Sequence, residues 1–227
     1  MSYKQFIKEL NGKRPEGELI KTWIYSLLTS LIIIGVMYYV KFRYIENFVP
    51  KYGYFLFFAA IGYAFILSTV KQVRSYGEFA CMSGMMIGMT TGMMSGFLAG
   101  FYVGAINGMF IGTMFGIFVG IPIGIWLGKC CGIMGIMEGA MAGLMSGIMG
   151  AMTSVMMIND NLKIATLIIS IISWIIIICL NYLIYTEMKE NNAVNKLDDT
   201  ITIGLTMILI SITIWLMVYG PKGPFLS

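Results

Sequence analysis

Residues 84–132 read GMMIGMTTGMMSGFLAGFYVGAINGMFIGTMFGIFVGIPIGIWLGKCCG, with a glycine at every fourth position. The thirteen glycines are Gly84, Gly88, Gly92, Gly96, Gly100, Gly104, Gly108, Gly112, Gly116, Gly120, Gly124, Gly128 and Gly132. The series then shifts by three residues and continues with Gly135, Gly139, Gly143 and Gly147. Small residues at this spacing let helices in a membrane approach closely. The pattern therefore predicts tightly packed helices in lipid.

The length of the uncharged run limits how the chain can fold there. Residues 79–128 contain no charged side chain, and one helix of that length would extend ~75 Å, more than twice the thickness of the hydrocarbon core. The run must therefore contain two spans. Its least apolar interruption is 104–108, which contains Asn107. We expect a tight reversal there, between spans at 79–103 and 109–128.

Other uncharged runs predict further spans at 22–40, 52–70, 132–157, 164–185 and 200–219. The expected fold class is all-α, a polytopic transmembrane helix bundle of about seven spans. Its third to fifth spans would form a glycine-zipper core. The expected divisions are a cytoplasmic N-terminal segment (1–21), a two-span hairpin (22–75), a Gly/Met-rich three-span core (76–158), a second two-span hairpin (159–220) and a tail (221–227).

Composition supports the same class. Apolar residues make up 58% of the chain and charged residues 11%, against about 25% charged residues in globular domains. The net charge of +4 resides in loops and gives no reason to expect a nucleic acid partner. With the N-terminus inside, ten of the fifteen Lys and Arg residues fall on the inner side. This bias predicts a cytoplasmic N-terminus and an external C-terminus. The expected location is a prokaryotic cell membrane.

The sequence gives no support for catalysis. It contains no histidine, which removes the commonest general base at neutral pH and the commonest metal ligand. The four cysteines lie within or beside apolar spans, where a disulfide framework is not expected. We therefore expect that the protein is not an enzyme.

The glycine series has two structural interpretations. A residue at every fourth position drifts about 40° per step around a helix, so the glycines form a wrapping stripe. The three spans could form a tight triple, or each could pack against copies of itself. The expected partners are accordingly the lipid bilayer and either a second copy of the chain or other membrane subunits.

Methionine is concentrated in the same region, which holds sixteen of the 21 methionines. In the fifth predicted span they form a stripe displaced roughly 200° from the glycines: Met134, Met137, Met141, Met145, Met149, Met152 and Met156. One interpretation is a flexible apolar filler around glycine. The other is a thioether path for a soft monovalent metal such as Cu(I), the only cofactor that the sequence suggests.

The predicted topology adds a possible metal station at the cytoplasmic face. The start of the third span, the end of the fourth and the start of the fifth lie at one depth. The thiols and thioethers brought together there are Cys81, Met82, Met85, Cys130, Cys131 and Met134. Glu138 lies one turn deeper, and an ionisable residue within a membrane is a functional-site candidate. The fourth cysteine, Cys179, is expected only to pack.

Two resemblances involve these residues. The pairs Met85, Met89 and Gly92, Gly96 resemble the Met-x-x-x-Met and Gly-x-x-x-Gly elements of the Ctr copper-uptake transporters. Those transporters have three spans, whereas this chain has about seven. Residues 137–145 resemble uncharacterised Met- and Gly-rich bacterial membrane proteins, some of which carry metal-related domains. The resemblances imply handling of Cu(I) by the methionines.

Two functions therefore remain open. The first is a transporter or membrane chaperone for a soft metal, with Met137, Met141 and Met145 in its path. The second is a non-catalytic membrane scaffold, or a subunit of an oligomeric complex or channel, assembled through its glycines. A metal path predicts that the methionine stripes of the third and fifth spans face one another, whereas a scaffold allows them to face lipid.

Overall fold

The computed structural model describes residues 15–40, 52–76, 79–188 and 199–221. Within these ranges every regular element is helical, as the sequence predicts. A short 3₁₀ turn, η3 (Lys129–Cys131), joins two of the long helices. The seven long helices that the described residues form are α2 (Pro15–Val40), α3 (Tyr54–Ser75), α4 (Cys81–Asn107), α5 (Met109–Gly128), α6 (Gly132–Met156), α7 (Leu162–Met188) and α8 (Asp199–Tyr219).

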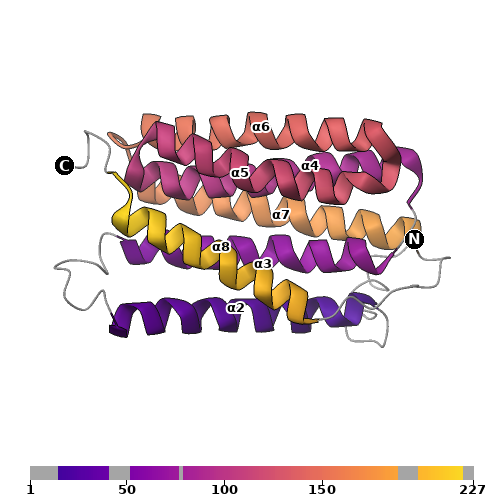
Figure 1. Cartoon of the computed structure of the whole chain (residues 1–227), viewed down its shortest axis with the longest axis horizontal. Helices are drawn as coiled ribbons and strands as arrows, with labels where there is room; N and C mark the ends of the chain where they lie inside the picture. Colours follow the sequence, from indigo (N-terminus) through magenta and orange to yellow (C-terminus); the bar gives the residue numbers. More distant parts are fainter. Residues whose placement is uncertain (1–14, 41–51, 77–78, 189–198, 222–227) are drawn as a thin grey trace.

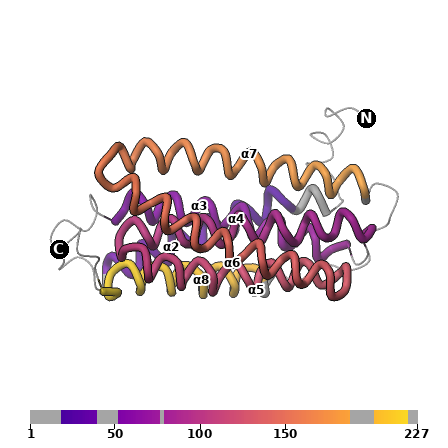
Figure 2. The backbone as a smooth tube through the Cα atoms, turned by 90° about the horizontal axis from the view of Figure 1, so that it is seen from above, coloured from indigo at the N-terminus to yellow at the C-terminus, as the bar shows by residue number. Residues whose placement is uncertain are grey.

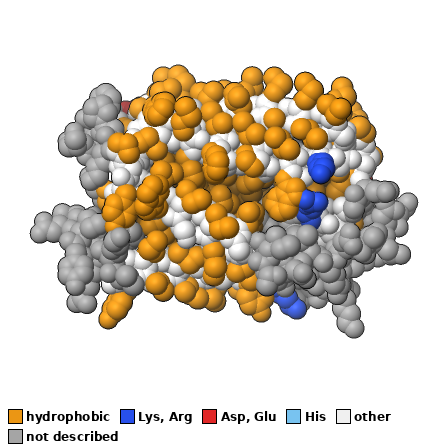
Figure 3. All heavy atoms as spheres, viewed as in Figure 1, with side chains coloured by type: hydrophobic (Ala, Val, Ile, Leu, Met, Phe, Trp, Pro, Cys, Tyr) orange, Lys and Arg blue, Asp and Glu red, His pale blue; other side chains and the backbone are white. Residues whose placement is uncertain are grey.

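The helices are long and apolar enough for a membrane. Six stretches of the described residues meet this requirement, and the longest, Met109–Met156, contains α5, η3 and α6. The helices lie alongside one another in one elongated bundle (Figure 1). Apolar side chains cover most of the face seen in Figure 3. These features are consistent with the integral membrane protein that the composition predicts.

The turn between α4 and α5 lies within the expected segment. Asn107 ends α4, Met109 begins α5, and the single residue between them is Gly108. Gly108 has φ 90° and ψ 174°, a conformation that glycine adopts at little cost because it has no Cβ. The Gly108 N–H donates to the Gly104 carbonyl at 3.1 Å. The chain therefore reverses within one residue, and α4 and α5 run antiparallel.

Glycines from α4, α5 and α6 meet in layers along these three helices. A Cβ built on Gly120 would lie 2.9 Å from the Cα of Gly96 and 3.0 Å from the Cα of Gly143. Three of the layers contain glycine on every helix: Gly92 with Gly124 and Gly139, Gly96 with Gly120 and Gly143, and Gly100 with Gly116 and Gly147. Backbones that approach this closely gain dispersion contacts and Cα–H···O bonds.

The shift of three residues in the glycine series coincides with the second reversal. Gly132 has φ 70°, and a Cβ there would meet nothing within 4 Å. Unlike the glycines inside the layers, Gly132 therefore serves the turn between η3 and α6. The shift places Gly135, Gly139 and Gly143 against Gly128, Gly124 and Gly120 of the antiparallel α5.

The other helices are organised around α3. This helix contacts α2, α4, α7 and α8, and most of its residues are buried. The sequence groups α7 and α8 as a hairpin, but α7 packs on α3 and α4, whereas α8 packs on α2, α3 and α4. Figure 2 shows α7 and α8 on opposite sides of the bundle. The apolar pattern of the sequence predicts where each span lies but not which helices that span packs against.

Two of the hydrogen bonds that join α4 to the outer helices are made by Asn107 and Tyr102. The Asn107 side-chain amide donates from Nδ2 to the Leu216 carbonyl of α8 at 2.7 Å. The buried Tyr102 and Ser170 hydroxyls lie 3.0 Å apart, between α4 and α7. Both contacts satisfy polar groups away from water, which favours this helix arrangement over its alternatives.

Candidate functional site

The predicted metal station lies where η3 meets the start of α4. Cys81 is the first residue of α4, and Cys130 and Cys131 belong to η3. A Cβ at Gly84 would lie 3.1 Å from the Cys130 sulfur and closer still to that of Cys131. Gly84 thus provides the space that brings η3 against α4. The Cys81 thiol meets the thiols of the adjacent Cys130 and Cys131, which are far from it in the sequence, at this end of the bundle.

The thiols contact one another and the backbone. The Cys131 thiol interacts with those of both Cys130 and Cys81, and Cys130 donates from its sulfur to the Leu127 carbonyl at 3.0 Å. All three cysteines are free. Within the described ranges, however, no group of three or more His, Cys, Asp or Glu side chains is arranged to hold a metal ion. A metal site here would therefore require methionine thioethers as further ligands, or a change in the positions of the cysteine side chains.

The thioethers that the sequence places at this end differ in exposure. Met82 is 81% exposed and Met134 is also exposed, so neither side chain is held by packing inside the bundle. Met85 is half-buried. Met85 is therefore the thioether of this group that packing restrains most.

The methionine stripe of α6 lies on the outside of the bundle. Its seven methionines are all exposed, and Met137 and Met141 each have 60% of their surface accessible. The opposite face of α6 carries the glycines that meet α4 and α5. On α4, Met82, Met86 and Met89 are also exposed. The two stripes therefore do not line a common interior path within one chain.

Glu138 and Cys179 remain isolated. Glu138 is half-buried on α6 and has no hydrogen-bond or ion-pair partner among the residues described. Cys179 is an exposed thiol on α7, a helix that carries none of the other three. Nothing in their surroundings assigns either residue a chemical role.

No protein-family model, curated protein or solved structure matches the chain. The assignment of function therefore depends on the chain's own residues.

The structure also reveals a contact that sequence reasoning missed. Arg74, at the end of α3, stacks on the Trp126 ring of α5 with 4.7 Å between the guanidinium carbon and the ring centroid. The available signal was a charged residue at the end of one span and a tryptophan near the end of another. Such residues are common at membrane interfaces, so the signal did not indicate that these two meet.

Proposed function

We propose that this protein is a non-catalytic membrane scaffold whose glycine-zipper unit, α4 to α6, presents the methionine face of α6 to another membrane protein. That partner is a second copy of the chain or a different subunit. The observation that carries the proposal is the division of α6 into two faces. Its glycines are used for contacts inside the chain, and its methionines are free for contacts outside.

The proposed topology has seven spans. The stretch Met109–Met156 is 48 residues long. Because η3 and the Gly132 turn reverse the chain between α5 and α6, this stretch crosses the membrane twice rather than once. Lys21, Lys71, Arg74 and Lys129 lie at the end where α2 begins, and Lys163 lies at the other. Figure 3 shows Lys and Arg near that first end on the visible face. This distribution favours an inner N-terminus.

A comparison within the chain supports a protein partner for α6. The exposed apolar residues of α7 are Ile and Leu, including Ile168, Ile171 and Ile175. Those of α6 are mostly Met. Lipid needs only apolar surface and is served by either type, so the difference calls for another cause. The unbranched, polarizable methionine side chain adapts to irregular protein surfaces and is common at adaptable interfaces.

Replacement of the three central methionines tests this proposal. We expect that Met137, Met141 and Met145 changed together to Ala will reduce association in lipid bilayers by about tenfold or more, because each loses a large contact side chain. Copies per particle are counted by single-molecule photobleaching, and other subunits by co-purification. Ile168, Ile171 and Ile175 changed together to Ala form the matched control on α7, for which association should persist. A wild-type protein that is always a monomer and co-purifies with no other subunit would contradict the proposal.

The meeting of three thiols favours a second candidate function. Cys81, Cys130 and Cys131 supply the thiolate ligands that select soft metals such as Cu(I). Met85, one turn after Cys81 on α4, carries a thioether. This function requires a path other than the α6 methionines, which face outward.

Titration of the reduced protein with Cu(I) against a competing chelator tests the thiol site. If the thiols bind metal, one tight equivalent should disappear when Cys81, Cys130 and Cys131 are all changed to Ser. Cys179→Ser is the control and should retain binding. Cu(I) binding no greater than that of detergent without protein would exclude this candidate function.

A further inference from the structure

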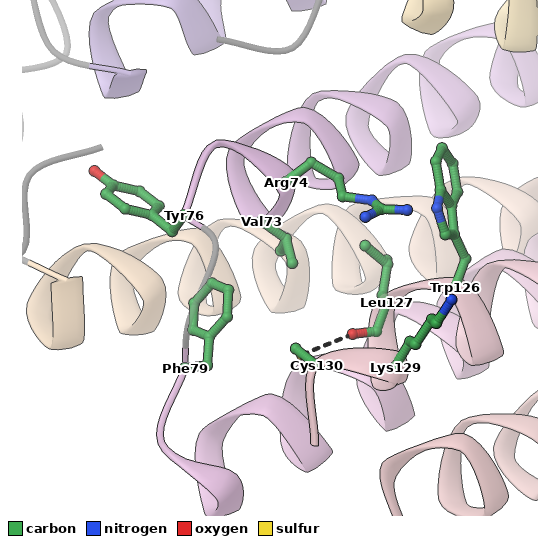
Figure 4. Close-up of a pocket in the computed structure, with 8 residues that line it drawn as sticks. All are labelled: Val73, Arg74, Tyr76, Phe79, Trp126, Leu127, Lys129 and Cys130. Atoms are coloured by element: carbon green, nitrogen blue, oxygen red, sulfur yellow. Dashed lines mark hydrogen bonds between the residues drawn. The ribbon is translucent and has the colours of Figure 1, made fainter. Parts of the chain in front are cut away.

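A pocket of about 300 Å³ lies between the end of α3 and the end of α5 (Figure 4). This volume is at the lower limit of pockets that hold small molecules. It is lined by Val73, Arg74, Tyr76, Phe79, Trp126, Leu127, Lys129 and Cys130. None of these lining residues carries a negative charge, and two carry a positive charge.

The two cationic side chains, those of Arg74 and Lys129, lie on the same side of the pocket as Trp126 (Figure 4). The Arg74 guanidinium lies over the Trp126 ring, 4.7 Å from its centroid. The tryptophan face fixes the plane of the guanidinium, because cations are attracted to the ring electrons.

Arg74 has an unused hydrogen-bond donor. Its Nε is buried and has no hydrogen-bond partner in the described structure. Buried donors are almost always paired, so an unpaired one calls for a ligand or water. The nearest acidic residue in the sequence, Glu78, lies outside the described residues. Glu187 of α7 accepts a hydrogen bond from the Ser83 hydroxyl at 2.5 Å and does not line the pocket.

The charges of the lining residues indicate which class of ligand the pocket would bind. Two cations without a lining carboxylate attract an anion. The guanidinium presents its donors in a rigid fork that matches phosphate oxygens, and the Lys129 ammonium adds a point charge. The pocket also lies at the ends of α3 and α5, the depth at which lipid headgroups are found.

We propose that this pocket binds a phosphate group through Arg74 and Lys129, with Trp126 holding the guanidinium in place. The phosphate belongs either to an anionic lipid headgroup or to a soluble phosphate. Basic pockets between spans are a known means of headgroup recognition. The site is independent of the proposed scaffold role, because α6 contributes no residue to it.

Native mass spectrometry of the purified full chain tests the lipid source. Phosphatidylglycerol is titrated against zwitterionic phosphatidylcholine, and we expect tighter binding of phosphatidylglycerol. Removal of one cation by Lys129→Gln should weaken that binding about fivefold. Because Lys129 is exposed, this variant is expected to fold normally. Arg74→Lys keeps the charge but loses the fork, so it should also weaken binding.

The matched control is Lys163→Gln, which removes one exposed positive charge at the other end of the bundle. It should leave the preference for phosphatidylglycerol unchanged. Inorganic phosphate is titrated in parallel, with protection against thermal unfolding as the measurement. Protection by phosphate that also displaces phosphatidylglycerol would support the site with a soluble ligand. No preference for either anion, or equal loss in Lys163→Gln and Lys129→Gln, would overturn the proposal.

Discussion

Gly143→Ala is expected to lower the free energy of unfolding by about 3 kcal/mol, which for a chain of this size is a fall of roughly 6–12 °C in Tm. The added Cβ would lie 2.5 Å from the Ile121 amide nitrogen and 2.6 Å from the Gly120 carbonyl oxygen. Both are backbone atoms, so no side chain can rotate to relieve the clash. The α5 and α6 helices would have to separate, and the layer shared with Gly96 would be lost.

The control for this change is Gly204→Ala in α8, where a new Cβ meets nothing within 4 Å. Alanine has a higher helix propensity than glycine by about 1 kcal/mol, so Tm should stay constant or rise slightly. Thermal unfolding of both variants in the same detergent provides the comparison. A Gly143→Ala protein as stable as Gly204→Ala would show that α5 and α6 do not meet at their glycines.

Asn107→Asp is expected to have an effect of similar size, a loss of about 3–5 kcal/mol. The change keeps the shape of the side chain but replaces the amide that donates to the Leu216 carbonyl. At neutral pH the new carboxyl must either hold a negative charge beside that carbonyl oxygen or take up a proton, and both cost free energy at a site where only 3% of the residue is exposed. The attachment of the α4 turn to α8 should weaken, and Tm should fall.

Asn159→Asp makes the same chemical change in an exposed turn between α6 and α7. Its Tm should match that of the wild type, since surface substitutions rarely exceed about 0.5 kcal/mol. Equal stability of the two Asp variants at neutral pH would show that Asn107 does not hold the turn against α8.

Part of the fold could be predicted because each span must satisfy its own backbone in lipid. The length of the uncharged run required a reversal, and the interruption at 104–108 located it to a five-residue segment. The turn itself is the last residue of that segment, Gly108, and α4 continues past the expected end at 103 to Asn107. The neighbours of α7 could not be predicted in the same way. Its small polar residues Thr166, Ser170 and Ser173 fall on the buried face, which is a signal for an inward face. They do not specify which helices that face meets, because Ile and Leu make up most of the rest of the helix.

The candidate site could be predicted only as far as topology places residues. Consecutive antiparallel spans bring Cys81 to the same end as Cys130 and Cys131. In the structure the Cys131 thiol interacts with that of Cys81, and Cys130 and Cys131 lie beside Gly84. The direction of the α6 methionines was left open, because either face of that helix could have packed inward. The contact between Arg74 and Trp126 depends on how α3 lies against α5, which no local pattern in the sequence specifies.

Photocrosslinking in native membranes tests the central claim most directly. A benzophenone amino acid replaces Met141 on α6 in one variant and Ile171 on α7 in another, both at exposed apolar positions. The account predicts a protein adduct from position 141, seen as a doubled or otherwise increased mass, and only lipid adducts from position 171. Lipid adducts alone from both positions would contradict the claim that the methionine face of α6 binds a protein.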